Sequence, residues 1–351
     1  MAAGHRTKRR GRGIQALVQR RWYERSPPRS LVLLGLARLY GWLVRHRQKT
    51  FRQAHSTVRL PVPVIVVGNI TVGGTGKTPL TIALVEALRE HGRHPGVVSR
   101  GYGGQRHVPE LLGDHPDPEE VGDEPCLIRV RTGAPVAVGR DRPAAARLLV
   151  EAGVDVVVAD DGLQHYPLQR DIEICVIDGM RRFGNGCLLP AGPLREPLER
   201  LSRVDFMVCN GGVPGTGEVP MRLMGDMAYP LLGEKPPIAL HTLAGRRVHA
   251  IAAIGNPQRF FDSLRAQRIE VTEHSFPDHY AFAERDLDFG DDLPVLMTGK
   301  DAVKCIYFAH TNWYSVPVRA RLPDAFIQDI VARLQRVRPG SSRRDRSSSR
   351  S

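Results

Sequence analysis

The sequence has 351 residues, which is long enough for two ordinary domains with separate hydrophobic cores, and 42% of its residues are hydrophobic. The formal net charge is +13 at pH 7, but residues 1–30 carry nine Lys or Arg against Glu24, and residues 333–351 carry seven Arg against Asp345. Because the excess charge belongs to the two ends, the composition argues against a basic globular core that binds nucleic acid, and no nucleic-acid partner is expected.

The cysteines and the apolar runs argue against two further classes of protein. Five cysteines, with no C-x-x-C spacing, are typical of free thiols in a reducing compartment. No run of 18 apolar residues is present, so a membrane-spanning helix is not expected. The first apolar segment begins only near Leu31 and no small-residue cleavage site follows it, so a secretory signal is not expected either.

The start of the chain combines a basic arm with an amphipathic helix. Residues 1–28 predict a disordered arm, which is either solvated or in contact with anionic lipid or nucleic acid. Residues 29–58 predict a helix capped by Ser30, apolar at first and with Arg38, Arg45 and Arg52 on one face. This pattern suits an anionic membrane surface, and the alternative is a core helix docked on the main domain.

A glycine-rich stretch at residues 68–78 follows a buried-strand pattern and leads into a helical pattern. Its backbone N–H groups can close around phosphate oxygens, Lys77 can reach the β- and γ-phosphates, and the Thr78 hydroxyl suits Mg²⁺. The strict pattern has glycine at position 71, and the alternative interpretation is a chance glycine turn. The predicted nucleotide-binding residues are Thr71, Val72, Gly73, Gly74, Thr75, Gly76, Lys77 and Thr78.

Strand and helix patterns alternate from residue 61 onward, which is typical of an α/β fold with a mostly parallel sheet. The first set of strands is predicted at 64–67, 96–99, 136–138, 154–159, 172–177 and 206–209, with helices at 81–91 and 142–152. A second set follows, with strands near 248–254, 268–273 and 294–298 and helices at 257–266 and 324–337.

Turn-rich segments at 211–217 and 233–237 indicate a domain boundary. We therefore predict a P-loop nucleotide-binding α/β domain at 59–235, a smaller C-terminal α/β domain at 236–338 and an Arg/Ser-rich disordered tail at 339–351.

Two carboxylates, Asp160 and Asp161, end the predicted strand at 154–159. The carboxyl edge of a parallel sheet is where such folds bind ligands, and a P-loop enzyme needs a carboxylate there for Mg²⁺ or its water shell. Neighbouring residues on a strand face opposite ways, so the two cannot share one role, and which of them serves the metal stays open. The alternative is that the pair caps the next helix.

Two loops carry residues suited to proton transfer. Asp123 lies where a loop enters a helix and is, taken alone, an N-cap candidate, and His279 lies in a predicted turn of the second domain, where a histidine is usually a surface residue. If the domains face each other across a cleft, a histidine oriented by a carboxylate is a competent base for an alcohol nucleophile.

Four further residues are candidates for contacts to substrate or phosphate. Arg100 follows a strand on a glycine-rich loop and Arg195 lies in a proline-rich loop, so either arginine can neutralise phosphate charge or merely pair with a surface acid. Gln164 and His165, which follow the acidic pair, complete this set.

In combination these motifs resemble the tetraacyldisaccharide 4'-kinases, the lipid A 4'-kinases of Gram-negative bacteria. The resemblance covers roughly residues 30–335 and rests on eight ordered motifs, at 68–79, 99–103, 122–125, 160–165, 189–197, 255–257, 276–280 and 300–304. It implies a P-loop domain with an N-terminal membrane-associating helix and a smaller domain that closes over the site. It also implies that residues 71–78 bind ATP, that His279 is the base for the sugar 4'-hydroxyl, that Asp123 raises the basicity of His279, and that Asp160 and Asp161 serve Mg²⁺ and the phosphates.

The sequence therefore predicts a kinase that uses ATP and Mg²⁺ to phosphorylate the 4'-hydroxyl of a tetraacylated disaccharide 1-phosphate at the cytoplasmic face of the inner membrane. Its predicted partners are this acylated disaccharide lipid and an anionic membrane surface, and the oligomeric state is left open. The rival hypothesis is a membrane-surface nucleotide switch or partitioning ATPase. Such loops typically carry a lysine where this chain has Val72, which argues against the rival.

Overall fold

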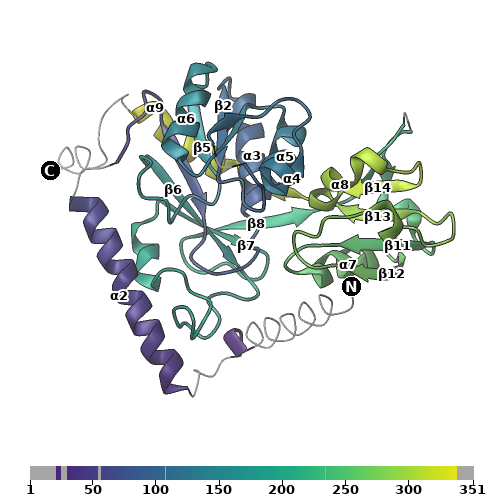
Figure 1. The fold of residues 1–351 in the computed structure, drawn as a ribbon, viewed down its shortest axis with the longest axis horizontal. Helices are drawn as coiled ribbons and strands as arrows, with labels where there is room; N and C mark the ends of the chain where they lie inside the picture. The colour runs from purple at the N-terminus through teal and green to yellow at the C-terminus, as the bar shows by residue number, and fades with distance from the viewer. Residues whose placement is uncertain (1–20, 25–29, 54–56, 107, 234, 338–351) are drawn as a thin grey trace.

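The structure, a computed structural model, describes residues 21–24, 30–53, 57–106, 108–233 and 235–337, with the side chains of residues 52 and 53 left out (Figure 1). Most of the predicted basic arm at 1–28 and all of the predicted tail at 339–351 lie outside these ranges.

The helices are α2 (Leu31–Gln53), α3 (Lys77–Glu90), α4 (Pro118–Val121), α5 (Asp123–Thr132), α6 (Arg142–Glu151), α7 (Pro257–Ala266), α8 (Gly299–Cys305) and α9 (Asp324–Arg336). Short 3₁₀ helices are η1 (Leu198–Arg203), η2 (Leu240–Leu243), η3 (Glu284–Asp286) and η4 (Ile306–Phe308). The strands of the larger sheet are β1 (Val64–Gly68), β2 (Pro95–Ser99), β3 (Glu110–Leu111), β4 (Val136–Val138), β5 (Val156–Ala159), β6 (Ile172–Asp178), β7 (Phe206–Asn210), β8 (Glu218–Met224) and β15 (Arg319–Arg321). The strands of the smaller sheet are β9 (Met227–Pro230), β10 (Ile238–Ala239), β11 (Arg247–Ala252), β12 (Glu270–Ser275), β13 (Val295–Thr298) and β14 (Trp313–Val316).

Within the described ranges, the larger sheet has nine strands in the order β15-β8-β7-β6-β1-β5-β2-β4-β3, of which only β3 and β15 run antiparallel to their neighbours. Every residue of β1, β2, β5 and β6 is buried, because helices and loops cover both faces of the sheet. Each fully buried Val or Ile in these strands contributes about 1.5–3 kcal/mol relative to leaving it exposed. The predicted parallel α/β architecture is confirmed, and all carboxyl ends of the central strands meet at one edge.

The smaller sheet, in the order β10-β9-β14-β13-β11-β12, forms a second lobe beside the first (Figure 1). Its central strands β11, β13 and β14 are parallel, and α7 packs Phe260, Phe261 and Leu264 into its core. The predicted smaller α/β unit is therefore present, with its own hydrophobic cluster.

The two lobes exchange segments in a way that the predicted boundaries at 235/236 and 338 miss. β9 already belongs to the smaller sheet, whereas β15 returns to pair with β8, and α9 packs Phe326, Ile330 and Leu334 into the core of the larger lobe. The chain thus crosses between the sheets twice, after Met224 and after Val316. An amphipathic pattern shows that a helix has an apolar face but not which core that face joins, and this is why α9 was placed in the wrong unit.

Helix α2 lies along the larger lobe, on the side away from the smaller one (Figure 1). Ser30 caps it as predicted, with its Oγ accepting a hydrogen bond from Leu33 N at 3.4 Å. One face is docked on the lobe: Tyr40 Oη donates to the backbone oxygen of Arg195 at 3.1 Å, and Phe51 packs against the Tyr166 ring. The opposite face exposes six large apolar side chains, those of Leu31, Val32, Leu36, Leu39, Trp42 and Leu43. Among the described residues no helix has the length and apolarity that crossing a bilayer requires.

Candidate active site

The loop between β1 and α3 forms a concave backbone turn that depends on its glycines. Gly73 and Gly76 have φ of 105° and 93°, a region that other residues rarely adopt. A Cβ at Gly76 would also overlap Asn210 Nδ2, which donates a 2.9 Å hydrogen bond to the backbone oxygen of Thr75. α3 begins at Lys77 rather than at the predicted residue 81, so the positive end of its dipole points into the turn.

Neighbouring segments fix the loop on its other flank. Val72 N donates to Pro193 O at 2.8 Å, Arg195 N donates to Ile70 O at 2.7 Å, and Gln164 Nε2 donates to Asn69 O at 2.9 Å. Thr71, which replaces a glycine of the strict pattern, is not among the residues with positive φ, so a side chain is tolerated there. The loop is therefore held open as a preformed cradle.

Lys77 and Asp161 meet at the mouth of this cradle. Lys77 Nζ lies 3.5 Å from Asp161 Oδ1 and 3.3 Å from Asn69 Oδ1, and Arg195 Nη1 lies 3.4 Å from Asp161 Oδ2. Burial by itself raises the pKa of Asp161, but the charges of Lys77, Arg195 and Arg142 outweigh it and hold that pKa below its usual range. Two cations that can face phosphate oxygens are thus gathered around one carboxylate.

Asp160 is in a different environment from its neighbour. It follows the end of β5, is buried, and accepts a 2.9 Å hydrogen bond from Thr81 Oγ1, so it does not cap the next helix. Burial, together with the negative charges of Glu124 and Asp161, raises the pKa of Asp160 to about 7. Among the described residues, its Oδ2 has no hydrogen-bond partner. A buried, unpartnered carboxylate oxygen beside two like charges is the kind of group that a divalent cation stabilises.

His279 and Asp123 come from different lobes and touch each other. Asp123 is the first residue of α5 and His279 lies in the loop after β12, with Nδ1 of the imidazole 3.1 Å from Asp123 Oδ2. This imidazole also packs against the Tyr102 ring, with centroids 5.3 Å apart and the ring planes at 60° to each other. Asp123 therefore orients the imidazole across the boundary between the lobes, and neither the N-cap nor the surface-histidine alternative describes these two residues.

Charges around Asp123 keep it ionised. Burial by itself raises the pKa of Asp123, but the hydrogen bond with His279 and the charges of Lys304 and Lys300 outweigh it and lower that pKa. Glu124, the next residue, pairs with Lys300 at 3.3 Å and is among the charges acting on Asp160. Sequence reasoning did not assign Glu124, Lys300 or Lys304, although the adjacency of Glu124 to Asp123 and the four-residue spacing of the lysines were available signals.

The loop that carries His279 approaches the cradle between β1 and α3 through Asp278. A Cβ placed on Gly255 would be 3.5 Å from Asp278 Oδ2 and 3.9 Å from Gly74 N, so the residue next to His279 approaches the cradle itself. Of the residues described, no group of three or more His, Cys, Asp or Glu has the geometry of a metal site. Mg²⁺ at phosphate-transfer sites is commonly held by one or two carboxylates together with phosphate oxygens.

The four residues predicted to contact substrate or phosphate lie in different environments. Arg195 is joined to the cradle through Asp161, and Gln164 supports the cradle from behind through its bond to Asn69. Arg100 is exposed at the carboxyl edge. His165 stands apart: burial and the charges of Arg142 and Arg170 lower its pKa to about 4, which leaves it neutral at physiological pH.

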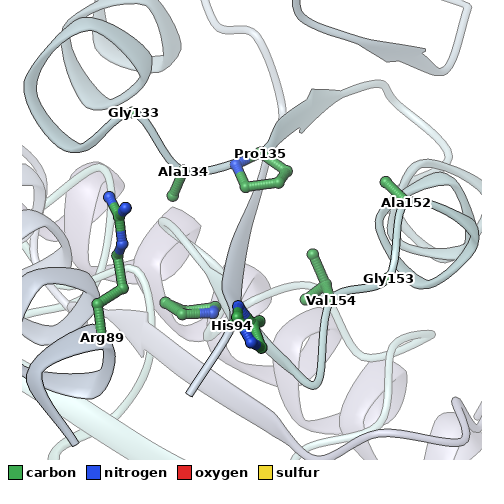
Figure 2. Close-up of a pocket in the computed structure, with 9 residues that line it drawn as sticks. Arg89, His94, Gly133, Ala134, Pro135, Ala152, Gly153 and Val154 are labelled. Atoms are coloured by element: carbon green, nitrogen blue, oxygen red, sulfur yellow. The ribbon is translucent and has the colours of Figure 1, made fainter. Parts of the chain in front are cut away.

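One surface hollow lies at the opposite edge of the larger sheet and is separate from this site. Figure 2 shows its lining, which includes Arg89, His94, Pro135 and Val154 at or near the amino ends of β2, β4 and β5. Open parallel sheets bind ligands at the carboxyl edge, so this hollow is not the candidate site.

Comparisons with known proteins identify the family to which these site features correspond. A sequence model of the family described as tetraacyldisaccharide-1-P 4'-kinase matches residues 29–335. The chain is 53% identical to the tetraacyldisaccharide 4'-kinase of Stenotrophomonas maltophilia (strain R551-3), over 91% of this chain and 96% of that protein. It is 47% identical to the enzyme of the same name from Methylobacillus flagellatus, over 93% and 98% of the two chains. Among solved structures it resembles "apo" form LpxK from Aquifex aeolicus in complex with ATP, with a TM-score of 0.73 and 28% identity over 86% of this chain and 98% of that one.

Proposed function

The chain belongs to the tetraacyldisaccharide-1-P 4'-kinase family, and from this premise we propose that its two lobes carry out phosphoryl transfer from ATP to the 4'-hydroxyl of an acylated disaccharide 1-phosphate. The observation that carries the proposal is the contact between His279 of the smaller lobe and Asp123 of the larger lobe, beside the cradle between β1 and α3.

ATP would bind with its phosphates in the cradle. The backbone N–H groups of residues 71–78 and the amino end of α3 favour the phosphate oxygens, and Lys77 and Arg195 neutralise their charge. Asp160, Asp161 and the Thr78 hydroxyl are the groups that would hold Mg²⁺, which supplies charge neutralisation on the phosphates when bound. Of the two carboxylates, Asp160 is favoured as the metal ligand because its Oδ2 has no other partner among the described residues.

His279 would take the proton of the acceptor hydroxyl. Its Nδ1 faces Asp123, which favours the tautomer with hydrogen on Nδ1, so Nε2 is the nitrogen that would accept the proton. Asp278 Oδ1 lies 3.8 Å from this Nε2. The carboxylate of Asp123 then stabilises the imidazolium that forms. Since a sugar hydroxyl is a weak nucleophile at neutral pH, a base placed next to the phosphate cradle lowers the barrier at the step where the oxygen attacks.

Helix α2 would hold the enzyme at the surface that contains its lipid substrate. Six exposed apolar side chains form one face of the helix, and exposed Arg38, Arg45 and Lys49 lie along its flank. Such a face inserts shallowly into an interface while the cations meet anionic headgroups. The exposed faces of α2 support attachment to a membrane surface, and we propose the cytoplasmic face of the inner membrane as that surface.

The activity itself is tested by ATP consumption with and without the lipid disaccharide in detergent micelles. We expect ADP to form only when the acceptor is present, with phosphate recovered on its 4'-oxygen, because a kinase commits ATP to the acceptor. Hydrolysis of ATP at the same rate without the sugar lipid would instead indicate a nucleotide switch or partitioning ATPase.

The membrane role of α2 predicts a selective loss of vesicle binding. The double variant Leu36→Gln/Leu39→Gln removes two large apolar groups that are 47% and 55% exposed, so folding should be preserved. We expect sedimentation with anionic vesicles to fall about tenfold or more, because each leucine contributes roughly 1–2 kcal/mol to insertion. ATP affinity should not change. The matched control is Leu111→Gln/Leu232→Gln, at leucines of similar exposure outside α2. Equal vesicle binding by both double variants would remove α2 from the membrane contact.

A further inference from the structure

Two lysines lie one turn apart on helix α8, at the boundary between the lobes. Lys300 and Lys304 are four residues apart, so they lie on the same side of the helix, and their side chains are only 16% and 7% exposed. Neither has a part in the phosphate binding or proton transfer described above. A buried lysine is costly unless it is paired, so its partners indicate what it does.

Lys304 contacts groups on both sides of His279. Its Nζ lies 2.9 Å from Asp301 Oδ1 and 3.8 Å from Asp123 Oδ2, and it donates a 3.0 Å hydrogen bond to the backbone oxygen of Tyr280. The Phe282 ring lies 4.9 Å from Nζ, where it favours a cation. The ammonium group thus joins the carboxylate that faces His279 to the backbone of the residue after His279.

Asp301 holds this lysine in a fixed position. The Asp301 side chain is fully buried, and its Oδ2 accepts hydrogen bonds from Ala253 N at 3.0 Å and from Thr298 Oγ1 at 2.6 Å. Thr298 Oγ1 in turn accepts from Asp301 N at the start of α8. These bonds tie α8 to the end of β11, so Lys304 projects from a rigid helix. Its ion pair with Asp301 orders the long side chain within the fold itself, before any substrate binds.

We propose that Lys304 is a positioning residue for the phosphoryl transfer, which holds the His279 loop and the Asp123 carboxylate together so that the imidazole keeps one orientation across the boundary between the lobes. The inference rests on the proposed role of His279 as the base. His279 has a φ of 59°, a left-handed conformation that is unfavourable for a residue other than glycine and persists only where the surroundings enforce it. The bond from Lys304 to the next backbone oxygen supplies such a restraint.

Charge supports the same conclusion. Asp123 and Asp301 both lie within 4 Å of Lys304 Nζ, so a neutral side chain at position 304 would leave two buried carboxylates without their shared cation. Lys304 is also one of the charges that keep Asp123 ionised, after its hydrogen bond with His279. An ionised Asp123 accepts a stronger hydrogen bond from Nδ1 than a protonated one would, so it holds the imidazole ring more firmly in one orientation.

Lys300 plays a parallel part on the flanks of the dyad. Its Nζ lies 3.3 Å from Glu124 Oε1 and 3.6 Å from Asp278 Oδ1, the residues adjacent to Asp123 and His279 in sequence. Each lysine therefore bridges one acid of α5 and one residue beside His279 in the other lobe. Among the described residues, the ion pairs of Lys300 are with Glu124 and Asp278 and not with His279 or Asp123, so Lys304 is the better target for a test.

The test is a double-mutant cycle between Lys304→Met and His279→Ala in the full-length enzyme, with kcat and the KM for ATP measured separately. If Lys304 acts through His279, Lys304→Met should lower kcat about tenfold to hundredfold in the native background and less than about twofold in the His279→Ala background. The KM for ATP should stay within about twofold. The control is Lys235→Met, at an exposed lysine of the smaller lobe that bonds only to Thr311 O among the described contacts.

Two results would overturn the proposal. Additive losses in the cycle would mean that Lys304 supports the fold rather than the base, and an unchanged kcat for Lys304→Met would mean that the dyad does not need it. If Lys304→Met does not fold, the same criterion applies to Lys304→Gln, a polar substitution that also removes the cation shared by Asp123 and Asp301. A His279→Ala variant with native turnover would instead refute the base assignment, which is a separate failure.

Discussion

The variant His279→Ala should lose turnover by about 10²- to 10⁴-fold while binding ATP with nearly native affinity. The imidazole is held by Asp123 at 3.1 Å and lies outside the turn that would hold the phosphates, so its removal takes away proton transfer without disturbing the nucleotide cradle. Steady-state kinetics with the lipid disaccharide would measure kcat, and titration with a fluorescent ATP analogue would measure affinity.

The matched control for this prediction is His241→Ala, since His241 is an exposed histidine of the smaller lobe. That variant should keep native kcat. Near-native turnover by His279→Ala would show that another group, or water alone, removes the proton of the hydroxyl, and the proposed role of the dyad would then be wrong.

The variant Lys77→Ala should be impaired at the binding of ATP, a step that precedes the proton transfer affected by His279→Ala. Lys77 begins α3 and its ammonium group lies at the mouth of the cradle, 3.5 Å from Asp161. Removing it deletes the cation that, in the proposed complex, would face the β- and γ-phosphates, and we expect kcat/KM for ATP to fall on the order of 10²- to 10³-fold. Lys77→Ala should lower the affinity for ATP, whereas His279→Ala should leave that affinity nearly unchanged, and this difference distinguishes the roles of the two residues.

Lys235→Ala serves as the control for Lys77→Ala, and circular dichroism would check that both variants are folded. Arg195 still neutralises Asp161 in the Lys77→Ala protein, so a buried unpaired carboxylate is not created. Native ATP affinity together with native kcat/KM in Lys77→Ala would contradict the assignment of the cradle.

Local patterns were sufficient to predict the elements that build the site. The glycine spacing around Gly73 and Gly76 permits a backbone with positive φ that leads into a helix, and the structure has this backbone. Runs of buried Val and Ile likewise indicated strands covered on both faces. These features depend on residues close in sequence, so the sequence carries them directly.

Features that depend on distant parts of the chain could not be predicted in the same way. The return of α9 to the larger lobe depends on which hydrophobic core accepts Phe326 and Ile330. The spacing of apolar residues along the helix does not indicate which of the two cores that is. The contact between Asp123 and His279 joins residues 156 positions apart, and only the family resemblance anticipated it. A role for Lys304 could not be predicted from the motif at 300–304 alone. Its role depends on contacts with Asp301, Tyr280 and Asp123, which come together only in the folded chain.

The central claim is that a base from one lobe meets a triphosphate held by the other, with a sugar lipid between them. A crystal structure with Mg²⁺, a non-hydrolysable ATP analogue and the acylated disaccharide tests it most directly. The account predicts that Nε2 of His279 lies within hydrogen-bonding distance of the 4'-hydroxyl, with that oxygen facing the γ-phosphorus. A ternary complex in which the imidazole lies far from both ligands would contradict it.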